Sequence, residues 1–134
     1  MPKTTLFLGA LGTIATGLPY VFYLYGSQEA EVAQWGRVAI ILGIVLLMLS
    51  WVLSEKHGLV SKLLLGLSFS SAAVLQIPPV VLWLTLRVAT DNTSPYSWVM
   101  AGLIALPHLL LFVVCAFVAF RVFKNVPSSP VPAV

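Results

Sequence analysis

Four long apolar stretches, separated by short polar segments, make up most of this chain. They run over residues 4–25, 38–53, 63–86 and 98–120. About 20 helical residues, with a range near 17–25, cross the hydrocarbon core of a bilayer, so each stretch can span a membrane, the second only just. The apolar runs are continuous rather than alternating, which predicts helices and not the strands of a barrel.

We therefore predict an all-α, integral membrane four-helix bundle, in which residues 1–126 form a single four-span transmembrane domain. The end of the chain, residues 127–134 (PSSPVPAV), is Pro-rich and predicted to be a disordered tail. Residues 26–36 (GSQEAEVAQWG) are predicted to form a brief interfacial helix between the first two spans. The third span is long and contains prolines, so we expect it to tilt or kink.

Composition supports a membrane protein. Hydrophobic residues make up 60% of the chain and charged residues only 8%, with a mean hydropathy of +1.03. A soluble domain of this size needs more charge to solvate its surface. The seven Lys and Arg residues are spread singly along the chain, a pattern that does not indicate nucleic-acid binding.

The basic residues gather at one set of span ends and predict the orientation. Five lie before the first span, between the second and third, and after the fourth; two lie in the other loops (Lys3, Lys56, Lys62, Arg121 and Lys124 against Arg37 and Arg87). Because Lys and Arg are enriched in cytoplasmic loops, both termini are predicted to be cytoplasmic. The compact loops suggest a bacterial inner (plasma) membrane.

A layer of polar residues is expected near the middle of the membrane. Gln76 lies near the centre of the third span, His108 near that of the fourth, and Thr13 and Thr16 near that of the first. Polar side chains at this depth must face partners or water. They, together with Trp83, are our candidate ligand-binding residues. The competing interpretation is that they only join helices to one another.

Prolines occur in three of the four spans, at or above this layer. They are Pro19, Pro78, Pro79 and Pro107. Each removes a helix hydrogen bond and tends to bend the helix. We expect a cavity in the outer half of the bundle, where freed carbonyls such as those of Leu75 and of Leu103–Ala105 can accept a hydrogen bond.

Small residues form faces along three of the spans, where helix backbones can approach closely. The candidate packing residues are Gly9, Thr13, Gly17, Gly66, Ser70, Ala101 and Ala105. These faces pack either within one bundle or against another chain. The second span, dominated by bulky aliphatic residues, is expected to be the most exposed to lipid.

The sequence offers no catalytic set. The spans contain no Asp or Glu, and the single cysteine, Cys115, makes neither an internal disulfide nor a structural zinc site. His57 and His108 are too far apart in depth for a haem with two histidine ligands. We assign no catalytic or metal-binding residue and no cofactor. A membrane-embedded enzyme would have only His108 as an intramembrane base.

Two functions remain. The first is a non-catalytic accessory or structural subunit that packs against other membrane proteins or forms a homo-oligomer in the lipid bilayer. The alternative is a small binding or transport protein for an apolar or amphipathic ligand, held near the bilayer midplane by His108 and Gln76.

Overall fold

The part of the chain that the structure describes folds into five helices that make four apolar spans. The computed structural model describes residues 3–22, 30–56, 58–89 and 95–125. Its helices are α1 (Lys3–Val21), α2 (Ala30–Leu53), α3 (Leu59–Leu75), α4 (Ile77–Ala89) and α5 (Pro95–Lys124). The all-α prediction is confirmed over these residues. The predicted tail, 127–134, lies outside them.

Four segments are long and apolar enough to cross a membrane, as predicted. They are Lys3–Val21, Val32–Leu53, Leu59–Leu84 and Ala101–Lys124. The third consists of α3 and α4, with Gln76 between them.

The second span is longer than the sequence indicated. The apolar pattern began at Val38, and residues 26–36 were expected to form a separate interfacial helix. Instead α2 begins at Ala30 and continues without a break through Gly36 and Arg37. Arg37 is exposed on the helix surface, so its charge does not end the helix. Residues 26–29 lie outside the described part of the chain.

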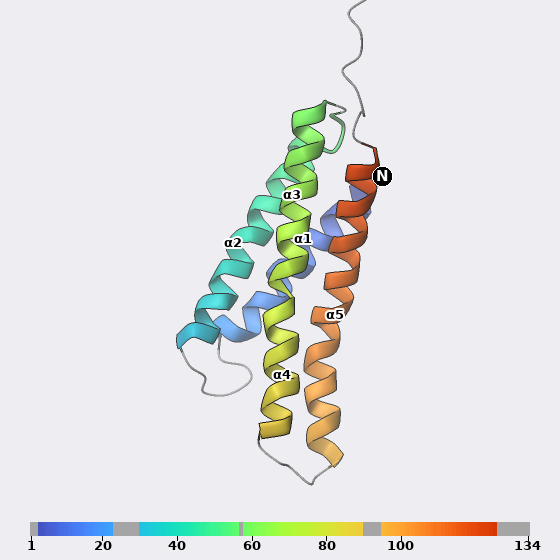
Figure 1. Ribbon diagram of the computed structural model, residues 1–134. Coiled ribbons are helices and arrows are strands. Elements are labelled where there is room, and N and C mark those ends of the chain that lie inside the picture. Colours follow the sequence, from blue (N-terminus) through green and yellow to red (C-terminus); the bar gives the residue numbers. More distant parts are fainter. Residues whose placement is uncertain (1–2, 23–29, 57, 90–94, 126–134) are drawn as a thin grey trace, which may run out of the picture.

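The helices form two hairpins that pack side by side (Figure 1). α1 packs most extensively on α2, and α5 runs along α3 and then α4. Contacts of α2 with α3 and of α1 with α5 join the hairpins. The start of α1 and the end of α5 lie at the same end of the bundle, which we call the terminal end (Figure 1). The opposite end is the far end.

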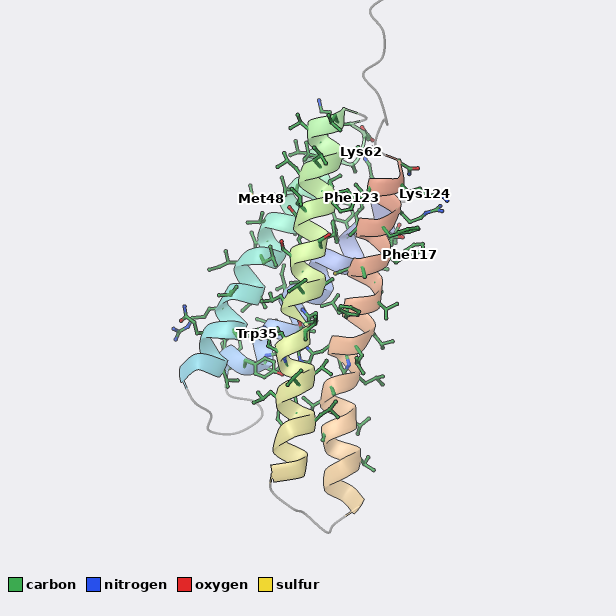
Figure 2. All side chains as sticks on the ribbon, in the orientation of Figure 1. Trp35, Met48, Lys62, Phe117, Phe123 and Lys124 are labelled. Atoms are coloured by element: carbon green, nitrogen blue, oxygen red, sulfur yellow. The ribbon has the colours of Figure 1, made fainter. Side chains whose placement is uncertain are left out.

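An exposed ion pair lies at the terminal end of the bundle. The Lys3 ammonium donates to the Glu55 carboxylate at 2.6 Å, linking the start of α1 to the segment that follows α2. Lys62 and Lys124 also lie toward this end, while Phe117 points away from the bundle (Figure 2). The basic residues therefore flank an apolar outer surface.

Glycines bring the backbones of α1 and α2 into direct contact. A methyl group at Gly17 would lie 2.6 Å from the carbonyl oxygen of Gly36, and one at Gly36 would lie 2.8 Å from that of Gly17. A methyl group at Gly43 would meet the amide nitrogen of Ile14 at 2.8 Å. The second span has the smallest buried share of the four. Through its narrow buried face, α2 nevertheless makes the closest backbone contact described, which is with α1.

The terminal half of the bundle has a continuous apolar core. Its members come from all four spans, and most are aliphatic or small: Leu6, Ala10, Leu46, Leu65, Phe69, Ala72, Ala73, Leu111, Cys115, Val118, Ala119 and Val122. Two buried polar side chains, Gln76 and His108, lie at the middle of the bundle, where α3 gives way to α4, whereas Ser50 is buried near the terminal end of α2.

Candidate functional site

A chain of hydrogen bonds joins four side chains from the first, third and fourth spans. His108 Nδ1 lies 2.7 Å from Gln76 Oε1, and His108 Nε2 lies 2.8 Å from the Tyr20 hydroxyl. Trp83 Nε1 donates to the same hydroxyl at 2.9 Å. Tyr20, Gln76 and His108 are almost completely buried, with 1%, 0% and 2% of their surfaces exposed. We call these four residues the polar chain.

The direction of each bond follows from the atoms involved. Gln76 Oε1 can only accept, so His108 Nδ1 carries a proton and donates it. A neutral imidazole then has Nε2 as its acceptor, and Tyr20 donates its hydroxyl proton there. The lone pairs of Tyr20 accept from Trp83, whose indole nitrogen can only donate. One neutral tautomer of His108 therefore satisfies every bond.

The polar chain forms where the third span is interrupted. Gln76 ends α3, and its backbone N–H turns back to the carbonyls of Ala73 and Val74. Pro78 and Pro79 follow, and neither supplies a backbone N–H. In a continuous helix, residue 79 would donate to the carbonyl of Leu75. That carbonyl accepts a 2.8 Å hydrogen bond from Trp35 Nε1 instead. The sequence-based expectation that this carbonyl would accept a donor is thus met, and the donor is on α2.

Trp35 also packs against the polar chain. Its ring meets the ring of Tyr20 edge-on, with centroids 5.1 Å apart, and that of His108 in the same manner at 5.4 Å. These arrangements are favourable for aromatic pairs and hold the tyrosine and histidine rings in place.

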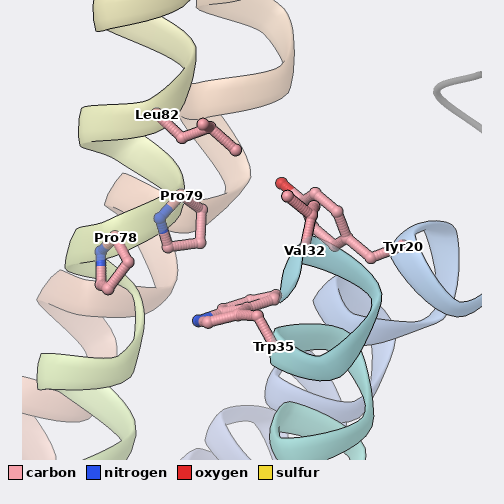
Figure 3. Close-up of a pocket in the computed structure, with 6 residues that line it drawn as sticks. All are labelled: Tyr20, Val32, Trp35, Pro78, Pro79 and Leu82. Carbon is pink, nitrogen blue, oxygen red and sulfur yellow. The ribbon is translucent and has the colours of Figure 1, made fainter. Parts of the chain in front are cut away.

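A pocket opens beside the polar chain, between α4 and the α1–α2 pair (Figure 3). Its volume is about 250 Å³. Most of its walls are apolar, and its lining residues are Tyr20, Val32, Trp35, Pro78, Pro79 and Leu82. We call this space the proline pocket. A cavity next to the prolines was predicted, but among them only Pro78 and Pro79 adjoin a helix break; Pro19 and Pro107 lie inside uninterrupted helices.

The predicted ligand-binding residues fall into two groups. Gln76, His108 and Trp83 meet in the polar chain. The two threonines donate within their own helix: Thr13 to the carbonyl of Gly9 at 2.8 Å, and Thr16 to that of Thr13 at 3.0 Å. Such bonds satisfy the hydroxyls locally. Thr13 also has a side-chain hydrogen bond with the Cys115 thiol of α5. Neither threonine bonds to the polar chain.

The residues proposed for helix packing lie mainly inside the bundle. All of them are buried except Ser70, which is half-buried. A methyl group at Gly9 would clash with the ring of Phe69, and one at Gly66 with the ring of Phe123. These glycines therefore accommodate aromatic side chains of the same chain.

Sequence reasoning did not include Tyr20 or Trp35 among the candidate site residues. A usable indication existed for Tyr20. It continues the stripe of Gly9, Thr13 and Gly17 by a further turn, and every member of that stripe is buried. No comparable pattern pointed to Trp35, because its position was assigned to a separate interfacial helix outside the spans.

Compared with models of protein families, with curated proteins and with solved structures, the chain shows no significant match. Within the described ranges, no group of three or more His, Cys, Asp or Glu residues is placed to hold a metal ion. The described site therefore provides neutral hydrogen-bonding side chains next to apolar pocket walls.

Proposed function

We propose that this protein binds a small, mostly apolar molecule within the membrane, in the proline pocket. The observation that carries the proposal is the position of Tyr20, which both lines the pocket and belongs to the polar chain. Concave apolar sites with a few fixed polar groups are typical of small-molecule binding. Here the tyrosine is held in place by His108 and Trp83, so its orientation does not depend on the ligand.

The walls of the pocket suit a permanent site. Pro78 and Pro79 have rigid rings and no backbone N–H, so this face of α4 offers a ligand apolar surface and no unpaired donor. Trp35 is fixed by its bond to the carbonyl of Leu75. A ligand would therefore meet preorganised groups, which lowers the entropic cost of binding.

We favour binding over transport. Beyond the polar chain, toward the terminal end, the bundle is filled by the apolar core around Phe69 and Leu46. A path through the described part of the molecule would have to displace that core. The count of basic residues supports a proposal that the terminal end is cytoplasmic. The proposal of a bacterial inner membrane depends on the compact loops alone.

An accessory-subunit role ranks second. It was suggested by small-residue faces, but Gly9, Gly17 and Gly66 are occupied by contacts within the chain. Those faces therefore do not need a partner protein to explain them.

The test is native mass spectrometry of the protein purified from its own membrane in mild detergent. We expect the wild type to carry a small-molecule adduct. Val32→Trp, which fills the pocket from α2, should remove the adduct. Val38→Trp, at an exposed position on the same helix, should retain it. A wild-type protein with the bare mass of the chain contradicts the proposal, and recovery only as part of a larger protein complex favours the accessory subunit.

A further inference from the structure

An open apolar groove runs along α1 and α2 near the terminal end of the bundle. Its volume is about 460 Å³, and almost all of its surface is apolar; the lining residues are Phe7, Leu47, Met48, Trp51 and Val52. Met48, Trp51 and Val52 are each more than half exposed. None of the lining residues belongs to the polar chain or to the proline pocket. The groove, which we call the terminal groove, is therefore a separate site.

An aromatic pair and an ion pair follow one another toward the terminal end of this groove. The ring centroids of Phe7 and Trp51 are 6.2 Å apart. Lys3 precedes Phe7 by four residues, Glu55 follows Trp51 by four, and these two charged residues form the 2.6 Å ion pair. Four residues make about one helical turn, so the ion pair lies about one turn beyond the aromatic pair. The terminal groove therefore leads from apolar walls to two opposite charges.

The ion pair has room for further partners. The side chains of Lys3 and Glu55 are both more than half exposed. The Lys3 ammonium has three N–H groups, and Glu55 accepts only one of them through Oε1. The carboxylate has a second oxygen, Oε2, that can accept another hydrogen bond. The pair thus presents a donor suited to a phosphate beside an acceptor suited to an ammonium group.

We propose that the terminal groove binds a membrane phospholipid whose headgroup carries a primary ammonium, as in phosphatidylethanolamine. An acyl chain lies in the groove, the phosphate accepts from Lys3, and the headgroup ammonium donates to Glu55. The four charges then alternate in sign. A choline headgroup has methyl groups in place of the N–H groups and gives Glu55 no donor. An apolar protein helix in the same place would complement the walls but not the charges.

Lipid titration followed by native mass spectrometry tests this site. Protein stripped of lipid in detergent is titrated with phosphatidylethanolamine or with phosphatidylcholine of identical acyl chains, and the dissociation constants of the first bound lipid are compared. We expect phosphatidylethanolamine to bind about fivefold more tightly, as the strongest exposed ion pairs would give. Equal affinities in the wild type overturn the proposal.

Charge variants test whether the preference comes from the ion pair. Glu55→Gln removes the carboxylate, so it should abolish the preference and leave the affinity for phosphatidylcholine nearly unchanged. Lys3→Gln should weaken the binding of both lipids to a similar extent, because both carry the phosphate. A preference that survives in Glu55→Gln contradicts the assignment of the ammonium to that carboxylate.

Two tryptophan substitutions at nearly equal exposure test the groove itself. Val52 lines it and is 59% exposed, whereas Val113, on α5 and outside it, is 61% exposed. Val52→Trp should abolish the preference for phosphatidylethanolamine, and Val113→Trp should retain it. Val32→Trp, which fills the proline pocket, should retain it too.

Two outcomes of these variants overturn the proposal. One is an undiminished preference in Val52→Trp. The other is a wild type that is dimeric in detergent and shows no headgroup preference, together with a monomeric Val52→Trp, which would assign the terminal groove to a contact between two copies of the chain.

Discussion

At the scale of single residues, the central feature is that His108 has a different partner at each ring nitrogen. Gln76 accepts from Nδ1, and Tyr20 donates to Nε2. A doubly protonated ring would present a second donor to Tyr20, which would then have to turn its own proton elsewhere. The polar chain thus specifies a neutral histidine in one tautomer and one ring orientation.

Tyr20→Phe is expected to destabilise the protein by about 1 kcal/mol. It leaves the acceptor of His108 and the donor of Trp83 without their shared partner, at a cost of about 1–3 kcal/mol in soluble proteins. Interhelical hydrogen bonds in membranes average nearer 0.6 kcal/mol, because the unfolded reference also finds partners. The measurement is unfolding in mixed micelles. The changes in unfolding free energy caused by Tyr20→Phe and His108→Ala should be non-additive in the double variant. Additive changes would contradict the hydrogen bond between these two residues.

Trp51→Phe provides the matched control for this cycle. Trp51 is 76% exposed and does not belong to the polar chain. The change in unfolding free energy caused by Trp51→Phe should simply add to that caused by Tyr20→Phe.

The ion pair between Glu55 and Lys3 should make the stability of the terminal end depend on pH. The hydrogen bond and the charge of Lys3 lower the pKa of the Glu55 carboxyl from its usual value of 4.5. A carboxyl whose pKa is lowered by folding contributes stability above its unfolded pKa and loses it as the pH falls through the folded one. We expect NMR titration of Glu55 to show a midpoint below 4.5, and Lys3→Gln to raise it. A midpoint unchanged by Lys3→Gln, or insensitive to salt, would contradict the pair.

Part of the polar chain could be predicted from residue depth. Gln76 and His108 stand out because a polar side chain is costly in the middle of an apolar run. Tyr20 and Trp35 do not, because amphipathic rings near span ends are ordinary at the membrane interface. Which of these rings turns inward depends on tertiary packing, to which the local sequence gives little guide.

At the scale of elements, the break between α3 and α4 creates both the polar chain and the pocket beside it. Pro79 frees the carbonyl of Leu75, and Trp35 of α2 takes it. A hydrogen bond between α2 and α3 therefore takes the place of one within the third span.

This replacement can be tested by a double-mutant cycle. Trp35→Phe should cost about 1 kcal/mol of unfolding free energy, because the carbonyl of Leu75 loses its donor. In a Pro79→Ala background the cost should be smaller, since the new backbone N–H at position 79 can bond to that carbonyl. An equal cost in both backgrounds would show that Trp35 acts by packing alone.

The contact of α1 with α2 gives a second prediction at this scale. Gly36→Ala places a methyl group 2.8 Å from the carbonyl oxygen of Gly17, so the helices must move apart, and we expect a loss of about 1–3 kcal/mol. Gly102→Ala is the control. Nothing lies within 4 Å of its added methyl group, and alanine favours a helix by up to about 1 kcal/mol over glycine. Equal effects on unfolding at both positions would contradict the contact.

The elements themselves followed well from apolar run length, with one exception. α2 extends through Arg37 to Ala30 because a charged residue on the outer face of a helix does not end it. Hydropathy detects the apolar part of a span but not a polar extension of the same helix. The pairing of Gly17 with Gly36 was likewise beyond prediction, because position 36 was assigned to a separate interfacial helix outside the second span.

At the scale of the whole molecule, the bundle is asymmetric along its axis. An apolar core fills the terminal half, whereas the polar chain and the proline pocket lie from the middle of the bundle onward. An even number of spans returns the chain to its starting end (Figure 1). The proposed binding site therefore lies outside the half of the bundle that the apolar core fills.

The most direct test of the central claim is an experimental density map of the protein crystallised from a lipid mesophase without added ligand. We expect His108 between Tyr20 and Gln76, with non-protein density in the proline pocket against Trp35 and Pro79. A His108 that faces lipid, or a pocket closed by the protein's own side chains, would contradict the account.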